Sequence, residues 1–408
     1  MGGHQRTLRH LPFFEALAAC EEGSAEWAGM TAGLVVLRLV DAWAEDGDAW
    51  RHGVPAVREV IAAIPAADPA RAVLDGVVTS LDRSASGDLS LVSPRLFAYG
   101  RSLDFTGRWR VAIDVYRTLL DFAHPLEDAD VATGASMRIG YCSRVLGEWE
   151  DARAGYAHAA EIAAARGDEA DALRSRVGLA NLARDRGNVP EAESLLDDVL
   201  ARTVSPELAD VRRIALHDRS AVAYLRGEAA HAVRLAHEAM PLTMPGVARD
   251  RLLADIGTYF AALGVRDAAR DAHLVVAHTA QEQFQRWSSM LALVELAVLD
   301  ADEAAFDAFR GEVAGAALPP ELAVLRALYE ARGHAAFGRA GDARTAAREA
   351  LARARESGQH RYVFEAESML EELATKTVSL RPAAAAAPGD LAPVAREIAE
   401  MRVLAGVG

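Results

Sequence analysis

Histidines come first when a sequence is searched for chemistry, because an imidazole can hold a metal ion or move a proton near neutral pH. The chain has 12 histidines, and the closest groupings are His231 with His237 and His273 with His278. A helical zinc site needs two histidines four residues apart with a carboxylate between them, and neither grouping has that spacing. We therefore predict no metal site and assign these histidines to packing or to the surface.

The other reactive residue types are also isolated. Asp197 and Asp198 resemble the first half of a diphosphate-binding acidic motif, but Ala201 stands where the third carboxylate belongs. Cys20 and Cys142 belong to no CxxC or Cys/His cluster, and Cys142 is expected to be buried. No glycine-rich loop could cradle a phosphate, and no serine or cysteine lies in a recognisable nucleophile motif. The sequence predicts no cofactor and no enzyme activity.

Composition narrows the class further. With 408 residues and 51% hydrophobic content, the chain is globular, and its net charge of −15 argues against bulk affinity for nucleic acid. All but one of its 44 basic residues are arginines, the exception being Lys376, and guanidinium groups favour bidentate recognition. We find no continuous apolar segment of a signal peptide and no run of about 18 uncharged apolar residues. We expect a cytoplasmic protein that does not span a membrane.

The elements that position these side chains repeat along the chain. Glycines recur every 40 residues, and an alanine follows each of them by five positions: Gly107, Gly147, Gly187 and Gly227, with Ala112, Ala152, Ala192 and Ala232. A fixed period of this length is typical of stacked repeats, in which each unit buries its apolar face against its neighbours. The period therefore predicts a repeat architecture rather than separate globular domains.

One unit shows what each repeat contains. Residues 134–146 predict a helix, Gly147 ends it, and residues 151–166 predict a second helix. Small residues at Gly140, Ala152 and Ala159 suit two antiparallel helices that cross closely. Each repeat is therefore expected to be a helical hairpin.

This pattern resembles the tetratricopeptide repeat, in a long bacterial variant, over residues 91–356. The matching sets are Gly100/Gly107/Ala112/Tyr116, Gly140/Gly147/Ala152/Tyr156/Ala159, Ala180/Gly187/Ala192/Leu196, Ser220/Gly227/Ala232/Ala236/Ala239, Gly257/Gly264/Ala269 and Phe337/Gly341/Ala346/Ala350. The resemblance implies an all-α fold, a right-handed solenoid of helical hairpins with helical caps. The tryptophan usual in such repeats is missing, the period exceeds the usual one, and residues 281–316 fit the pattern poorly.

The chain divides into five parts on this reading. A cap of degenerate repeats is expected at 1–90, with helices at 27–43 and 55–64 and a further one that starts at Asp68-Pro69. The solenoid spans 91–356, and a terminal capping helix spans 357–376. An alanine- and proline-rich linker at 377–390 then leads to an amphipathic tail helix at 391–408.

The first helix of each hairpin is expected to line the concave face of the solenoid. Residues at i, i+4 and i+7 of these helices share that face. They predict a peptide-binding groove lined by Phe97, Arg101, Tyr141, Arg144, Asn181, Arg184, His217 and Tyr224. The next hairpin offers only Ala254, Thr258 and Ala261, so the second half of the groove is expected to be lined by small residues.

Each half of the groove admits two interpretations. Arg101, Arg144 and Arg184, with Asn181, could bind a peptide segment that carries carboxylates, or they could pair with the nearby acidic residues Asp104, Glu148, Asp185 and Asp218. The small-residue half could receive the tail helix, from the same chain or from a second copy that self-associates. It could instead mark a stretch where a tight superhelix brings its own helices together.

The sequence therefore favours a non-enzymatic scaffold or adaptor that binds a protein or peptide in its concave groove. The alternative is a regulatory sensor that binds a small ligand or a signal peptide. An α-helical enzyme is a third class, but it would need convergent carboxylates or histidines in the groove, and arginine, tyrosine and alanine occupy it. No metal, nucleic acid or membrane partner is expected.

Overall fold

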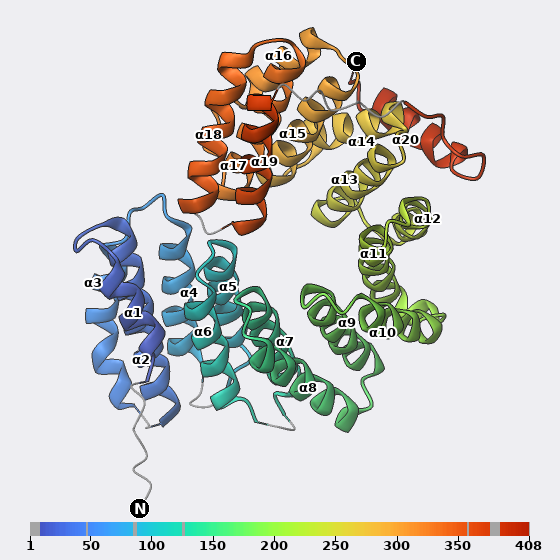
Figure 1. The fold of residues 1–408 in the computed structure, drawn as a ribbon. Helices are drawn as coiled ribbons and strands as arrows, with labels where there is room; N and C mark the ends of the chain where they lie inside the picture. The colour runs from blue at the N-terminus through green and yellow to red at the C-terminus, as the bar shows by residue number, and fades with distance from the viewer. Residues whose placement is uncertain are drawn as a thin grey trace, which may run out of the picture. The chain divides into compact units, whose positions relative to one another are not determined.

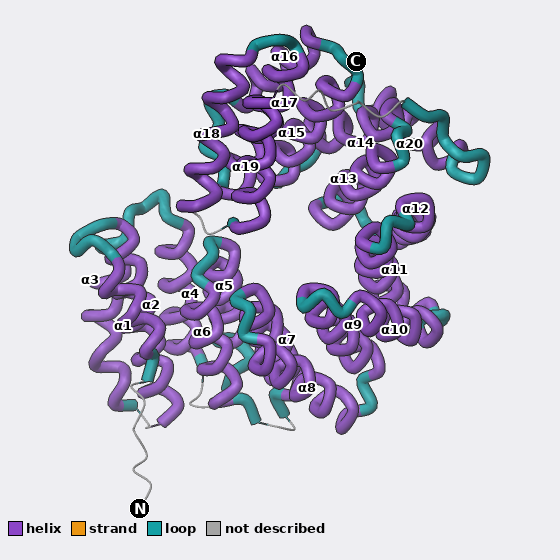
Figure 2. Tube along the Cα trace, viewed as in Figure 1, coloured by secondary structure: helices purple, strands orange, loops and turns teal. Residues whose placement is uncertain are grey.

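A computed structural model describes residues 9–45, 48–84, 88–124, 127–356, 359–375 and 384–407. This described part contains 20 α-helices, three short 3-10 helices and no strand (Figures 1 and 2), which confirms the predicted all-α class. The chain forms two compact units, residues 1–199 and 200–408, each of which is described by itself below.

Four helices open unit 1 and cover its first hairpin. They are α1 (Leu11–Ala19), α2 (Ala25–Glu45), α3 (Val54–Ala62) and α4 (Pro69–Arg83), with a 3-10 helix at Ala49–Gly53. The start of α4 is as predicted, because the Asp68 carboxylate accepts a hydrogen bond from the Ala70 amide at 2.9 Å. These helices and the next three share one apolar core that contains Phe13, Leu37 and Trp43.

Helix α2 is the one described helix that is long and apolar enough, by length and composition, to cross a membrane. Its candidate span, Ala25–Ala44, has 61% of the window buried within the protein. Leu37, Val40 and Trp43 are fully buried in the core of unit 1. A buried core helix passes the same test of composition, so the span is weak evidence for a membrane segment.

Helical hairpins form the rest of unit 1. The pairs are α5 (Ser93–Phe105) with α6 (Trp109–Phe122), α7 (Ala129–Val145) with α8 (Trp149–Arg166), and α9 (Glu169–Asp185) with α10 (Val189–Arg202). The turn glycines Gly107, Gly147 and Gly187 have φ between 74° and 81°, a conformation that residues with a Cβ atom rarely adopt. The glycines therefore recur every forty residues because each of these hairpin turns has the same positive-φ geometry. The boundary between the units falls within α10.

Unit 2 continues the same construction. Its helices are α11 (Ala209–Leu225), α12 (Ala229–Ala239), α13 (Val247–Ala262), α14 (Arg266–Thr279), α15 (Gln283–Leu299), α16 (Glu303–Val313), α17 (Pro320–Ala336), α18 (Ala340–Glu356), α19 (His360–Thr375) and α20 (Ala392–Leu404), with 3-10 helices at Pro206–Leu208 and Met240–Leu242. Each helix from α11 to α15 packs against the next one along the chain. Likewise, α17 packs against α18, and α18 packs against α19.

Residues 281–316, which fitted the sequence pattern poorly, form the hairpin α15–α16. Ala301 stands at its turn with φ 59°, in the left-handed region that glycine fills elsewhere. Asp302 then caps α16 by accepting a hydrogen bond from the Ala305 amide at 2.9 Å. An alanine at the turn position hides this repeat from a search for periodic glycines.

The last hairpin corrects one prediction. Gly341 matched the turn position by sequence, but it lies inside α18, and Gly338 is the turn residue, with φ 77°. Gly338 follows the turn residue Ala301 by 37 residues, as Ala301 follows Gly264, so the forty-residue step does not hold in this part of the chain. The positive φ, rather than the period, marks the turn.

The tail helix α20 packs against α14 in unit 2 (Figure 1). Leu391, Val394 and Ile398 are almost fully buried in the core that α13, α14 and α15 share. Three ion pairs flank this contact: Arg234–Asp390 at 2.6 Å, His237–Glu397 at 2.8 Å and Arg402–Asp271 at 3.3 Å. Of the predicted linker at 377–390, residues 377–383 lie outside the described part.

In one of the two interpretations of the small-residue face at Ala254, Thr258 and Ala261, the tail of the same chain fills it, but the tail packs against α14 instead. Those residues line a pocket instead. The tail carries charges opposite to those on α12 and α14, and that match, together with its apolar stripe, explains its position on α14.

A contact between a glycine and a large ring joins the two helices of a hairpin. A Cβ atom added to Gly100 would lie 2.6 Å from the Tyr116 ring, and one added to Gly140 would lie 2.9 Å from the Tyr156 ring. His273 fills the corresponding place against Gly257. In each case the ring follows the glycine by 16 residues, so the contact repeats with the fold.

We expect Gly155→Ala to destabilise unit 1. A Cβ atom there would lie 2.7 Å from the backbone nitrogen of Gly140, so α7 and α8 would have to separate. We expect the free energy of unfolding in urea to fall by about 1–3 kcal/mol. The control is Gly29→Ala in α2, where nothing lies within 4 Å, and it should gain up to about 1 kcal/mol from helix propensity. Equal effects of the two substitutions would contradict the close-crossing account.

A buried histidine anchors the start of the described chain. His10 is 3% exposed, and its Nδ1 lies 2.8 Å from Asp114 Oδ2 on α6, while its Nε2 lies 2.9 Å from Asp41 Oδ2 on α2. Arg9 pairs with Asp41 at 2.8 Å, and its guanidinium lies 3.8 Å from Asp121. Burial by itself disfavours the imidazolium, but the hydrogen bonds and charges of Asp114 and Asp41 outweigh it and raise the pKa of His10 to about 9. An imidazolium donates to both carboxylates at once.

This histidine should make the stability of unit 1 depend on pH. Because its pKa rises on folding from 6.5 to about 9, its contribution is complete below pH 6.5 and is lost as the pH rises toward 9. The loss should reach roughly 3 kcal/mol in urea unfolding of the wild type. His10→Leu should remove this slope, whereas His52→Leu at an exposed site should retain it. The same slope in wild type and His10→Leu would contradict the assignment.

Candidate functional site

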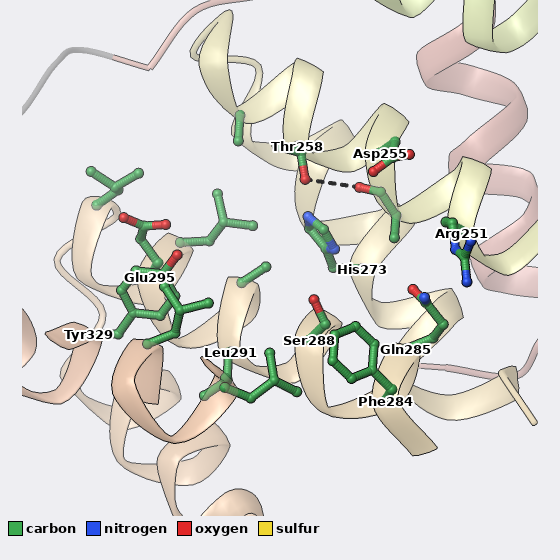
Figure 3. Close-up of a pocket in the computed structure, with 17 residues that line it drawn as sticks. Arg251, Asp255, Thr258, His273, Phe284, Gln285, Ser288, Leu291, Glu295 and Tyr329 are labelled. Atoms are coloured by element: carbon green, nitrogen blue, oxygen red, sulfur yellow. Dashed lines mark hydrogen bonds between the residues drawn. The ribbon is translucent and has the colours of Figure 1, made fainter. Parts of the chain in front are cut away.

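A pocket of about 380 Å³ lies within unit 2, where the first helices of three successive hairpins, α13, α15 and α17, come together (Figure 3). Helix α13 contacts α15, and α15 contacts α17. Small residues at Ala254 and Ala261 on α13 and at Ala292 on α15 leave the space open. Leucines supply the apolar part of the lining, among them Leu291, which is 1% exposed.

One wall of the pocket carries neutral polar groups. Thr258, Gln285 and Ser288 line it, and the Thr258 hydroxyl donates to the Ala254 carbonyl at 3.1 Å. In Figure 3 the His273 ring lies between Thr258 and Ser288. Hydroxyl and amide groups of this kind can pair with the backbone of a bound peptide.

His273 contributes to this wall as an uncharged ring. It is 3% exposed, and its Nδ1 lies 3.4 Å from the Ser289 hydroxyl. Burial, only partly opposed by the charge of Asp255, lowers its pKa to about 4. The ring is therefore neutral near pH 7 and able to accept or donate a single hydrogen bond.

Carboxylates stand at two edges of the pocket, and both are already paired. Asp255 Oδ2 lies 2.6 Å from His217 Nε2 on α11. Glu295 pairs with Arg332 at 2.8 Å, and Arg332 also pairs with Glu365 on α19. Burial raises the pKa of the Glu295 carboxyl, and the charge of Arg332 opposes that rise. Both carboxylates are therefore already engaged by basic side chains, Asp255 by His217 and Glu295 by Arg332.

Two of the predicted site residues belong to unit 2. His217 is the partner of Asp255, so it adjoins the pocket through that ion pair. Tyr224 lies on α11 with its ring 5.0 Å from that of Tyr259. These two side chains contact the next hairpin.

The other six predicted site residues belong to unit 1, and the charged ones are mostly paired. Arg144 forms an ion pair with Asp185, and its guanidinium lies 5.3 Å from the centre of the Tyr141 ring. Arg184 Nη2 lies 3.1 Å from the same Asp185 carboxylate. This pairing is one of the two interpretations that the sequence left open. Arg101 is exposed on α5.

The aromatic members of the unit 1 set take part in packing. The Phe97 ring lies 5.9 Å from that of Tyr116, and the Tyr141 ring lies 5.9 Å from that of Trp109. Asn181 is partly buried on α9. The eight predicted residues are thus divided between the two units, with six in unit 1 and two in unit 2.

Sequence reasoning missed most of the pocket. Glu295 and Gln285 lie in the segment whose repeat was hidden by Ala301, and Tyr329 follows it. The available signal was the Asp302 cap, which marks the start of α16 independently of glycine. His273 was assigned to packing or the surface, and it is buried in the pocket wall.

Metal binding finds no support in the described residues, where no three His, Cys, Asp or Glu side chains cluster closely enough to hold an ion. The buried thiol of Cys142 has its pKa raised by burial to about 12, and a thiol in that state is a poor nucleophile.

Comparisons with known proteins found distant likeness to solved structures alone. No family model and no curated protein matches the chain. Among solved structures, NprR in complex with its cognate peptide NprX is 13% identical, with TM-score 0.45, over 82% of this chain and 86% of that one. A tetratricopeptide repeat protein from Parabacteroides merdae is 14% identical, with TM-score 0.41, over 76% and 98%. A Rap protein complexed with Competence and Sporulation Factor is 10% identical, with TM-score 0.38, over 85% and 98%.

Stacked helical hairpins with glycine turns and a repeated glycine–ring contact define a tetratricopeptide-like helical-repeat protein, as the sequence resemblance implied. At such low identities and TM-scores, the likeness to solved structures carries no argument about this chain. The function must therefore be argued from the side chains of this chain.

Proposed function

We propose that the protein is a non-enzymatic scaffold that binds a peptide or protein segment through unit 2, with the α13–α15–α17 pocket receiving an apolar side chain. One observation carries this proposal: the pocket combines a leucine and alanine lining with a neutral polar wall at Thr258, Gln285 and Ser288. Leucine surface favours an apolar side chain, and the polar wall supplies partners for the adjoining peptide groups.

The size of the pocket supports one or two side chains rather than a large cofactor. Its volume of about 380 Å³ is at the lower end of the range for small-molecule sites, about 300–1,000 Å³. The exposed ring of Phe284 lies at this pocket and offers further apolar contact to a bound segment. A longer peptide would extend from the pocket along the first helices of neighbouring hairpins.

Bond chemistry is not part of the proposal. His273 is buried and neutral, and Asp255 and Glu295 are held by His217 and Arg332. Binding by shape and charge complementarity requires none of these groups to change its protonation state.

An acidic peptide segment held by Arg144 and Arg184 remains a second element of the proposal, in unit 1. Such a segment would have to exchange with Asp185, which pairs with both guanidinium groups. Arg101 is exposed and would meet such a segment first. Because exchange leaves the number of ion pairs unchanged, it should contribute less affinity than burial of an apolar side chain.

Filling the pocket should abolish peptide capture. Ala292→Phe places a ring in the pocket, whereas Ala304→Phe adds the same ring at an exposed position on α16. On an array of short random-sequence peptides, wild type and Ala304→Phe should retain a common set with an apolar residue. Ala292→Phe should bind those peptides at least about tenfold more weakly, a difference of about 1.4 kcal/mol.

Two results would count against this function. Peptides held equally by wild type and Ala292→Phe would place binding outside the pocket. If no peptide is retained but a small molecule raises the melting temperature of wild type and not of Ala292→Phe, the sensor alternative would replace the scaffold.

A further inference from the structure

A second pocket lies in unit 1, and its chemistry differs from that of the first. It has a volume of about 370 Å³ and is formed by α8, α9 and the start of α10. Leu179, Leu182 and Leu195 supply its apolar lining, and Arg153 from α8 and Arg186 from the end of α9 also line it. None of these residues belongs to the groove that the sequence predicted.

The two arginines are available to a ligand. Within the described residues, neither Arg153 nor Arg186 pairs with a carboxylate, whereas Arg144 and Arg184 are both held by Asp185. Both free arginines are exposed. In a chain with a net charge of −15, two unpaired guanidinium groups at one pocket make a local positive site.

The one carboxylate of the pocket has a partner of its own. Glu191 Oε2 accepts a hydrogen bond from the Asn188 side-chain amide at 2.6 Å, and the Glu191 amide donates to Asn188 Oδ1 at 3.4 Å. This reciprocal pair lies at the first turn of α10, where a carboxylate is favoured by the helix dipole. Glu191 is therefore hydrogen-bonded to Asn188 without a contribution from either arginine.

We infer that this pocket binds a small organic anion, a carboxylate or phosphate group carried on a short apolar chain. Guanidinium groups bind both anions through paired hydrogen bonds, and the leucine lining removes the chain from water. The volume suits a ligand of this size rather than an extended peptide. The inference is independent of the proposed peptide site, because the two pockets lie in different units and share no residue.

Calorimetric titration of the full chain with four probes tests this inference. Octanoate and octyl phosphate carry both features of the ligand, acetate carries the anion alone, and octanol carries the chain alone. At least one of the two amphiphilic anions should bind saturably, at least tenfold more tightly than acetate and octanol. The tighter of the two identifies the preferred head group.

Substitutions then locate the site. Arg153→Gln/Arg186→Gln should weaken binding of the amphiphilic anion at least tenfold, and Arg95→Gln/Arg117→Gln, which removes two exposed charges from α5 and α6, should leave it unchanged. Circular dichroism establishes that each variant is folded, and the single variant Arg153→Gln serves if the double variant is not. Ala292→Phe, which fills the other pocket, should not alter this binding.

Three results with these probes and the arginine variants would overturn the inference. They are the absence of saturable binding by both amphiphilic anions, equal binding of octanol, and unchanged affinity in the arginine variants. A loss of binding in Ala292→Phe would assign the ligand to unit 2 and would equally overturn it. Because peptide capture is measured separately, failure here leaves the proposed function standing.

Discussion

Close crossing of the two helices in each hairpin is the constraint on which the rest of the structure depends. Gly140 and Gly155 meet at one crossing, and the Tyr156 ring fills the space that the missing Cβ atom of Gly140 leaves. Gly257 and His273 repeat the arrangement in unit 2. Because the ring is fixed against the first helix of its own hairpin, the neighbouring first helices approach one another, and their side chains meet across hairpins.

The close approach of successive first helices determines which charged side chains are held in ion pairs between hairpins. First helices in succession are joined by ion pairs such as Arg144–Asp185 in unit 1 and Glu295–Arg332 in unit 2. Arg144, which the sequence left open between a ligand and an ion pair, is therefore used between repeats. Arg153 lies on a second helix, outside this series, and has no such partner.

The fold was largely predictable, whereas the site was not. The repeat period and the small residues at the helix crossings indicate the hairpins whose turns lie between Gly107 and Gly264. Each of these turns has a positive φ, which favours glycine. The α15–α16 hairpin escaped because Ala301 adopts that conformation without being glycine. The pocket depends on how α13, α15 and α17 pack, and a partnership such as His217–Asp255 joins residues 38 positions apart. No local pattern records how three helices pack, so the pocket could not be derived from spacing alone, whereas Asp185 was already a candidate partner of the groove arginines.

The central claim is that a bound peptide occupies the α13–α15–α17 pocket, and site-specific photo-crosslinking tests it most directly. A photoreactive side chain would replace Ala254, which lines the pocket, or Ala304, which is exposed on α16. With the peptide that binds wild type most tightly, the account predicts an adduct from position 254, mapped to the apolar residue of the peptide, and none from position 304. An adduct of equal yield from both positions, or none from position 254 while the peptide remains bound, would contradict it.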